Sequence, residues 1–247
     1  MNYKDITVGI VSFKSEKVIF DCLKSIKSIK KIIIFDNSYD IETKKKVANI
    51  YPNIKFILSK KNLGYGEANN KIIKSCKTEY LFILNPDTIL QPNCEMQLMK
   101  SINDLKLNFT IIAPISNKKD FGNFDNSKVI FTKKLIKVDF VKGYAMLLNV
   151  KKIKKLGMFD KNIFLYLEEI DLCKRIKERN QKIFVNKEAK IIHLEAKSTD
   201  LKFEFEKCRN WHWIWSKFYF NKKYSNKIIV TLKFLPELLL IFFKLII

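Results

Sequence analysis

Histidine and arginine are scarce in this sequence of 247 residues. It contains two histidines, His193 and His212, and only three of its 47 basic residues are arginine. Proteins that read nucleic-acid bases rely on the flat arginine guanidinium, which makes paired hydrogen bonds to a base edge. The shortage of arginine therefore argues against sequence-specific nucleic-acid binding, and we expect no nucleic acid as a partner.

Cysteine and glycine are present but form no recognisable motif. The five cysteines are widely scattered without paired metal-ligand spacing, which argues against a cysteine-based metal site and is typical of reduced thiols in a cytosolic protein. Neither GxxxxGKS/T nor GxGxxG occurs, so neither a P-loop nor a dinucleotide-binding site is indicated. The chain does not open with a basic segment and a long apolar run, and we expect no secretory signal peptide.

Lysine supplies nearly all of the positive charge, and the formal net charge is +22. A lysine-rich surface suits anionic lipid headgroups or phosphorylated substrates, and a merely solvated surface is an equally good interpretation. The hydrophobic content of 47% and the charged content of 29% are typical of a globular protein. The length allows one large domain with a small appendage.

Short apolar runs dominate the first ninety residues. They are continuous rather than alternating, which is typical of parallel strands buried on both faces, and they occupy residues 6–11, 32–35, 54–58 and 80–84. Residues 15–30 and 67–75, which lie between them, have the spacing of helices. Strands that alternate with helices predict an α/β fold with right-handed crossovers.

The second half of the chain is less regular. Residues 118–137 are polar and predict a loop with a weak strand. Acidic residues open and basic residues close a predicted helix at 168–179, an order that the helix dipole favours without any catalytic role. Two further short strands are predicted, at residues 182–185 and 190–193.

Polar residues and glycine collect where the predicted strands end. The tips read Ser12-Phe13-Lys14, Asp36-Asn37-Ser38, Asn62-Leu63-Gly64-Tyr65-Gly66 and Asn85-Pro86-Asp87. In open parallel sheets the carboxyl ends of the strands meet at one edge, and ligands bind there. The sequence therefore predicts a ligand crevice at this edge.

The residue types at these tips suit a nucleotide and a metal. Asp36 has the position to accept a hydrogen bond from a base N–H, with the Phe13 ring as a stacking face. Asp87 offers the hard oxygen ligand that Mg²⁺ or Mn²⁺ prefers. His193 ends a predicted strand, where a lone histidine serves either as a structural residue or as a ligand.

Seven motifs in order carry a resemblance to a known family. They are VSFK, IIIFDNSYD, NLGYGEANN, LFILNPDT, KGYAMLLN, FDKNIFLYLEEIDLCKR and IIHLEAKST. Together they resemble the inverting glycosyltransferase family 2, and within it the bacterial rhamnosyltransferase-like enzymes, over residues 6–224. The resemblance implies a GT-A nucleotide-diphospho-sugar transferase fold, with a mixed, mostly parallel sheet flanked by helices. The domain would span residues 1–225, with a nucleotide-binding half at about 1–115 and an acceptor half at about 116–225.

The resemblance also assigns roles by position in the motifs. It implies nucleotide-binding roles for Ser12, Phe13, Asp36, Asn62, Asn70 and Asn85, and sugar or acceptor roles for Gly143, Tyr144, Glu168 and Asp171. It places the divalent cation on Asp87 and His193, and the catalytic base on Glu169. Asn85 takes the place of the first aspartate of the family's DxD motif, which leaves the metal site with fewer charged ligands.

The C-terminal tail is apolar and aromatic. Aromatic residues and lysines alternate over residues 211–224, a composition that suits a membrane interface or packing on the domain. In the following helix, Lys233, Glu237 and Lys244 fall on one narrow stripe of an otherwise apolar surface. Residues 226–247 are therefore predicted to form an amphipathic helix that lies in an anionic membrane surface, with packing on the domain as the alternative.

These expectations combine into one functional hypothesis. The chain is expected to be a metal-dependent inverting glycosyltransferase, cytoplasmic and peripheral on the inner face of the cell membrane. It would transfer rhamnose from dTDP-rhamnose to a lipid-linked glycan or an oligosaccharide in surface-polysaccharide assembly. The alternatives are a UDP-hexose donor with the same fold, and an inactive nucleotide-sugar-fold module that scaffolds other enzymes at the membrane.

Overall fold

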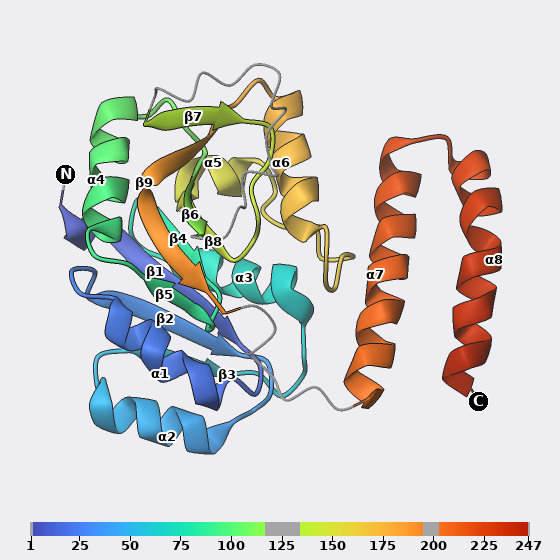
Figure 1. Cartoon of the computed structure of the whole chain (residues 1–247), viewed down its shortest axis with the longest axis horizontal. Helices are drawn as coiled ribbons and strands as arrows, with labels where there is room; N and C mark the ends of the chain where they lie inside the picture. The colour runs from blue at the N-terminus through green and yellow to red at the C-terminus, as the bar shows by residue number, and fades with distance from the viewer. Residues whose placement is uncertain (1, 117–133, 195–202, 247) are drawn as a thin grey trace.

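The computed structural model describes residues 2–116, 134–194 and 203–246 (Figure 1). For residues 203–207, 238 and 241–246 it describes only the backbone. Much of the predicted irregular segment at 118–137 therefore lies outside the described residues.

A central sheet of nine strands organises the described part of the chain. Its order is β3-β2-β1-β4-β8-β6-β9-β5, with β7 paired to β9. The strands are β1 (Ile6–Ser12), β2 (Lys31–Asp36), β3 (Lys55–Leu58), β4 (Tyr80–Leu84), β5 (Thr88–Leu90), β6 (Ile111–Ser116), β7 (Leu135–Val138), β8 (Ala145–Asn149) and β9 (Ile183–His193). The first four strands of this order run parallel, whereas β8 runs antiparallel to both β4 and β6, so the predicted mixed sheet is confirmed.

Helices cover both faces of the sheet (Figure 1). They are α1 (Glu16–Ser25), α2 (Ile41–Ile50), α3 (Gly64–Ser75), α4 (Cys94–Leu105), α5 (Val150–Lys155), α6 (Glu168–Glu178), α7 (Phe203–Tyr224) and α8 (Lys227–Ile246), after a short 3-10 turn at Tyr3–Asp5. Buried residues of α3, α5 and α6 form one core, and those of α1, α2 and α4 form the other. The result is a layered α/β/α domain.

The continuous apolar runs follow from this layering. In β4, Tyr80, Phe82 and Leu84 belong to the core under α1 and α4, whereas Leu81 and Ile83 belong to the core under α3 and α6. Successive side chains of a strand point to opposite faces. Because both faces are covered, every position of the strand must be apolar, as the sequence predicted.

One prediction about the strands is wrong. The two short strands expected at 182–185 and 190–193 are one strand, β9, which contains an irregularity. Its pairing with β6 shifts register between Asn186 and Lys190. The buried Asn186 side chain accepts hydrogen bonds from the backbone N–H groups of Glu188 and Ala189, so the polar residues form a bulge inside the strand.

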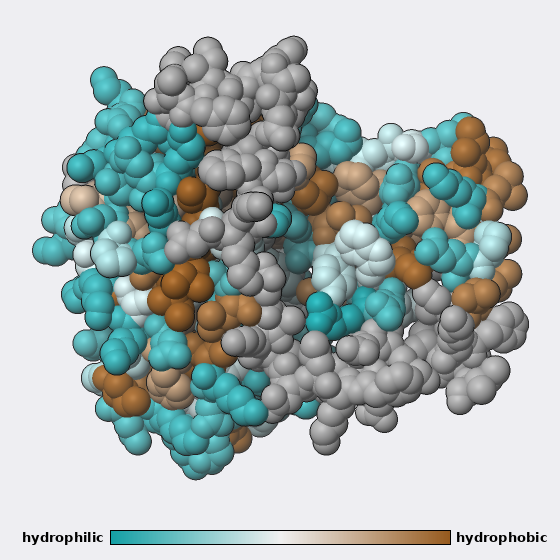
Figure 2. Space-filling model, viewed as in Figure 1, coloured by the Kyte–Doolittle hydropathy of each residue, from teal (hydrophilic) through white to brown (hydrophobic). Residues whose placement is uncertain are grey.

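The C-terminal helices α7 and α8 pack against each other as a hairpin beside the domain (Figure 1). Val230 and Phe234 of α8 are buried against Phe218 of α7. The outer side of α8 carries exposed apolar residues, seen in brown at the right of Figure 2. Within the described residues, no helix has both the length and the low charge content that crossing a membrane requires.

Candidate active site

The parallel register brings three predicted tips to one edge of the sheet. Ser12 at the end of β1 lies beside Asp36 at the end of β2, and Leu84 at the end of β4 lies beside Ile10. Asn85 follows Leu84 and donates its backbone N–H to the Tyr144 carbonyl, which precedes β8. The chain therefore gathers the predicted nucleotide, metal and sugar segments at the carboxyl end of the parallel strands.

Asp36 is buried in a pocket of hydrogen-bond donors. Its Oδ2 accepts from the Ser12 hydroxyl at 2.7 Å, and its Oδ1 accepts from the backbone N–H groups of Ser38 at 3.0 Å and Asp40 at 2.9 Å. The Ser38 hydroxyl donates to the same carboxylate. Phe13 follows Ser12 at the same tip and is half-buried. To read a base, Asp36 must therefore share an oxygen that the Ser38 hydroxyl already uses.

The start of α3 is joined to the tip of β2. The Asn37 side chain accepts from the Leu63 N–H and donates to the Gly64 carbonyl, both at 3.1 Å. Asn62 is exposed, and its Oδ1 accepts from the Gly64 N–H. Gly64 has a φ of +75°, and a Cβ there would lie 2.1 Å from the carbonyl oxygen of Phe164, so only glycine fits this close approach.

Tyr65 connects α3 to the segment before β8. Its hydroxyl donates to the Gly143 carbonyl at 2.6 Å. Burial raises the pKa of Tyr65, and the negative charges of Glu168, Glu169 and Asp87 raise it further.

The segment after β4 holds two buried oxygens without a hydrogen bond. Among the described residues, neither Asn85 Oδ1 nor Asp87 Oδ1 has a hydrogen-bonding partner. His193 at the end of β9 places its Nε2 3.4 Å from Asp87 Oδ1, and its ring stacks on Tyr144 with centroids 4.6 Å apart. The pairing of Thr88 with His193 across β5 and β9 creates this contact.

This donor set fits a divalent cation. A buried oxygen without a hydrogen bond is costly, and a cation would satisfy both Asn85 Oδ1 and Asp87 Oδ1. Carboxylate, amide and imidazole groups are ligands that Mn²⁺ accepts. Within the described ranges there is no group of three or more His, Cys, Asp or Glu that could hold a metal. The predicted cation ligands that lie together are the pair Asp87 and His193, and the neutral Asn85 precedes them in the same segment as Asp87.

Two glutamates open helix α6. Leu167 precedes them in the left-handed conformation, with a φ of 67°, and Tyr166 has a φ of 71°. Glu168 is 5% exposed, and its Oε2 has no hydrogen-bonding partner among the described residues. Glu169 is half-buried beside Gly143, where a Cβ would lie 3.7 Å from the Glu169 carboxyl carbon. The absence of a side chain at Gly143 keeps this space open.

Burial affects the pKa of both glutamates. It raises the pKa of both carboxyls, and the charge of Glu169 raises the pKa of Glu168 further. Two neighbouring carboxyls cannot both ionise easily, and the pKa of the more deeply buried Glu168 is raised the more strongly. We interpret Glu168 as the protonated partner and Glu169 as the ionised one.

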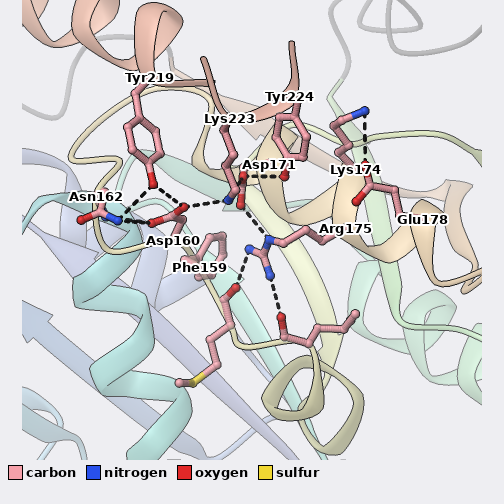
Figure 3. Close-up of polar contacts among 12 residues, drawn as sticks. Phe159, Asp160, Asn162, Asp171, Lys174, Arg175, Glu178, Tyr219, Lys223 and Tyr224 are labelled. Atoms are coloured by element: carbon pink, nitrogen blue, oxygen red, sulfur yellow. Dashed lines mark hydrogen bonds and ion pairs between the residues drawn. The ribbon is translucent and has the colours of Figure 1, made fainter. Parts of the chain in front are cut away.

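Two of the predicted site residues are committed to protein contacts. Asn70 donates to the Phe159 carbonyl at 3.0 Å and accepts from the Phe159 N–H at 2.9 Å. Asp171 is fully buried, and it binds Arg175, Lys223 and Tyr224 (Figure 3). Both side chains therefore hold protein segments together, and their roles toward a ligand stay predictions.

The sequence analysis missed Asn37 and Tyr65 as site residues. Both residues lie within the family-like motifs, but the expected roles were assigned to residues beside them. The available signals were the position of Asn37 directly after Asp36 and that of Tyr65 between two glycines. What each side chain contacts depends on segments 26 and 78 residues away along the chain.

Comparison with known proteins places this geometry in a family. The sequence profile described as Glycosyl transferase family 2 matches residues 7–170. A curated relative, the low-salt glycan biosynthesis hexosyltransferase Agl10 of Haloferax volcanii, is 25% identical over 196 residues, which cover 71% of this chain. The chain spans 62% of the length of that relative.

Solved structures support the same fold. The mannosyltransferase PcManGT from Pyrobaculum calidifontis, in complex with GDP-Man and Mn²⁺, aligns with a TM-score of 0.69 at 13% identity, over 90% of this chain and 65% of its own. S. aureus TarS residues 1–349 align with a TM-score of 0.59 at 12% identity, over 92% of this chain and 73% of theirs. At these identities the likeness shows the fold alone, and it confirms the predicted GT-A fold.

The family profile covers well over half of the chain, and its match ends at the glutamates that open α6. The strand tips, the Asn85–Asp87 segment and the paired glutamates all lie inside it, as the motif resemblance predicted. The chain therefore belongs to glycosyl transferase family 2.

Proposed function

We propose that this protein is a metal-dependent inverting glycosyltransferase that moves a hexosyl residue from a nucleotide sugar to a glycan acceptor. One observation carries the proposal. Two consecutive residues connect the two halves of the site, because Gly143 lies against Glu169 and the Tyr144 ring stacks on His193. A sugar held at Gly143 and Tyr144 would therefore have the base on one side and the cation ligands on the other.

The chemistry follows from these positions. Asp87, His193 and Asn85 would hold the cation, which when bound neutralises negative charge on the departing nucleotide diphosphate. Glu169 accepts the proton of the acceptor hydroxyl as this hydroxyl attacks the sugar carbon. The attack comes from the face opposite to the leaving group, so a single displacement inverts the anomeric centre. Glu168, the more deeply buried member of the pair, remains protonated beside Glu169.

For the donor we propose a pyrimidine nucleotide sugar. The Asp36 carboxylate suits the ring N–H of uracil or thymine, and dTDP-rhamnose is our first candidate, with a UDP-hexose as the second. Neighbours of the same fold bind GDP-Man in PcManGT and UDP in S. aureus TarS. The identity of the nucleobase in the donor therefore needs a direct test.

Thermal-shift titration with dTDP, UDP and GDP, with and without Mn²⁺, tests the nucleotide assignment. We expect Asp36→Asn to weaken pyrimidine nucleotide binding by about tenfold or more, because one charged acceptor is lost. Ser38→Ala is the matched control, since it removes only the hydroxyl that competes for the Asp36 carboxylate. The affinity of this variant for pyrimidine nucleotides should be unchanged or higher. Preference for GDP, or equal affinity in Asp36→Asn, would contradict the assignment. Nucleotide binding without turnover would favour the inactive scaffold.

For the acceptor we propose a lipid-linked glycan reached from the inner face of the cell membrane. Residues 1–225 would form the catalytic domain, and the helix within 226–247 would rest on the membrane surface. Exposed apolar side chains support this proposal, since Ile228, Leu232, Leu235 and Leu239 lie on the side of α8 that faces away from Phe218. Lys227 and Lys233 are exposed on the same helix and suit anionic headgroups.

Vesicle sedimentation tests the membrane proposal. Leu232 is 67% exposed and Leu235 is 46% exposed, so Leu232→Glu combined with Leu235→Glu should leave the melting temperature unchanged. It should weaken binding to anionic vesicles by about tenfold or more, because two apolar side chains no longer enter the interface. Leu107→Glu is the matched control, since Leu107 is 64% exposed on the body of the domain. If the intact protein does not bind to anionic vesicles, the membrane proposal is wrong.

A further inference from the structure

Asp171 is the buried centre of a polar cluster behind the candidate base. It lies two residues after Glu169 in α6 and is fully buried. Its Oδ2 accepts from Arg175 Nε at 2.8 Å, and its Oδ1 accepts from Lys223 Nζ at 2.5 Å and from the Tyr224 hydroxyl at 2.8 Å (Figure 3). The last two donors come from the end of α7, which follows the segment that the family profile matches.

Lys223 bridges two carboxylates. Its Nζ also donates to Asp160 Oδ2 at 2.7 Å, and the Tyr219 hydroxyl contacts the same oxygen at 3.1 Å. Burial alone would lower the pKa of Lys223, but its hydrogen bonds to Asp160 and Asp171 outweigh burial and raise it. We call this cluster, which comprises Asp160, Asp171, Arg175, Tyr219, Lys223 and Tyr224, the C-terminal clasp.

The helix that carries Lys223 also holds the loop that leads into the two glutamates. Helix α7 contacts this loop directly, because Ser216 Oγ donates to the Leu165 carbonyl at 2.7 Å and Arg209 Nε donates to the Tyr166 hydroxyl at 2.7 Å. Tyr166 and Leu167 both adopt the left-handed conformation, which costs energy for residues other than glycine and persists only where the surroundings impose it. Contacts from α7 supply part of that constraint.

We infer that Lys223 is a positioning residue for the proposed reaction. It draws α7 against α6 and thereby holds the strained Tyr166–Leu167 turn from which Glu168 and Glu169 project. Without its charge, Asp160 and Asp171 lose the cation that they share, and among the described residues Asp171 keeps one cation, Arg175, and the neutral Tyr224 hydroxyl. The catalytic unit therefore extends through α7 to Tyr224, while none of the described side chains of α8 belongs to the clasp.

This inference rests on the proposed transferase activity, and kinetics of Lys223→Met test it. We expect kcat to fall by about tenfold or more, because a small displacement of a catalytic group is costly. The Kd for nucleotide with Mn²⁺ should change by less than about twofold, since that site lies at other tips of the sheet. Lys223→Arg keeps the charge and should restore most of kcat. Lys177→Met is the matched control, because it breaks an exposed ion pair of α6 with Asp139.

A second measurement needs no substrate. In Lys223→Met, backbone amides of residues 165–171 should exchange hydrogen faster, whereas those of α1 should not change. If Lys223→Met does not fold, Tyr224→Phe removes one hydrogen bond to Asp171 and should show the same pattern more weakly. A lower melting temperature with unchanged kcat and unchanged exchange at residues 165–171 would overturn the inference. If the wild type shows no transfer but Lys223→Met still exchanges faster at residues 165–171, the proposed function is contradicted and the structural role of the clasp stands.

Discussion

Asp87→Ala should reduce glycosyl transfer by about 10³-fold or more, because a metal-bound diphosphate contributes several kcal/mol to stabilisation of the transition state. Asp87 is the only carboxylate in the proposed ligand set, since Asn85 is neutral and His193 supplies a nitrogen. Loss of this charge should abolish metal binding at the site. Transfer rates measured with Mn²⁺ in the assay check this expectation.

The thermal behaviour of Asp87→Ala separates a metal role from a structural one. Asp87 Oδ1 is buried and accepts no hydrogen bond from the described residues, so its removal should not lower the melting temperature of the metal-free protein. The increase in melting temperature that Mn²⁺ produces in the wild type should disappear. Asn85→Asp is the matched variant, because it adds a second carboxylate and should strengthen that increase. Near-normal transfer by Asp87→Ala in Mn²⁺ would rule out the proposed metal site.

Glu169→Gln should lower kcat by about 10²-fold or more with little change in nucleotide affinity, because it keeps the shape of the side chain but removes the base. Burial raises the pKa of Glu169, so the rate of the wild type should fall with decreasing pH above the usual titration range of glutamate. Only the ionised carboxylate accepts a proton. A pH profile of kcat checks this, and the acid limb should vanish in Glu169→Gln.

Glu168→Gln serves as the control for the pair. A protonated glutamate resembles glutamine, so this variant should reduce the rate less than Glu169→Gln does. The raised pKa of Glu168 means that its stabilising contribution is present at low pH and is lost as the pH rises through the folded-state value. Glu168→Gln should therefore raise the melting temperature at neutral pH, and the gain should disappear near pH 4. A larger rate loss in Glu168→Gln would show that Glu168 is the base.

Local pattern was sufficient for much of the fold. The runs that became β1, β2 and β4 are almost continuously apolar because helices cover both faces of the sheet, and this property is visible in each segment alone. The polar strand ends were equally visible. Since parallel strands share one edge, the sequence also predicted that these ends meet, and the registers of Ser12 with Asp36 and of Ile10 with Leu84 confirm it.

Contacts between distant segments decided the remainder. The bulge at Asn186 exists because β6 and β9 pair out of register, and no local pattern in the polar residues there reveals it. Asp171 belongs to a charged motif beside Glu169, yet at about 100° per residue it points almost opposite to Glu169. It meets Lys223, which lies 52 residues further along the chain.

The sequence by itself determined the fold class, the family and the residue types at the strand tips, because periodicity and motif order are local properties. Only the tertiary structure decided which polar residues face the site and which hold the protein together. Asn70 and Asp171 are bound by partners on other elements, whereas Asn85 Oδ1, Asp87 Oδ1 and Glu168 Oε2 are buried without a hydrogen bond from the described residues. A buried polar atom must find a partner, and only the folded chain shows whether the protein provides it or leaves it to a ligand.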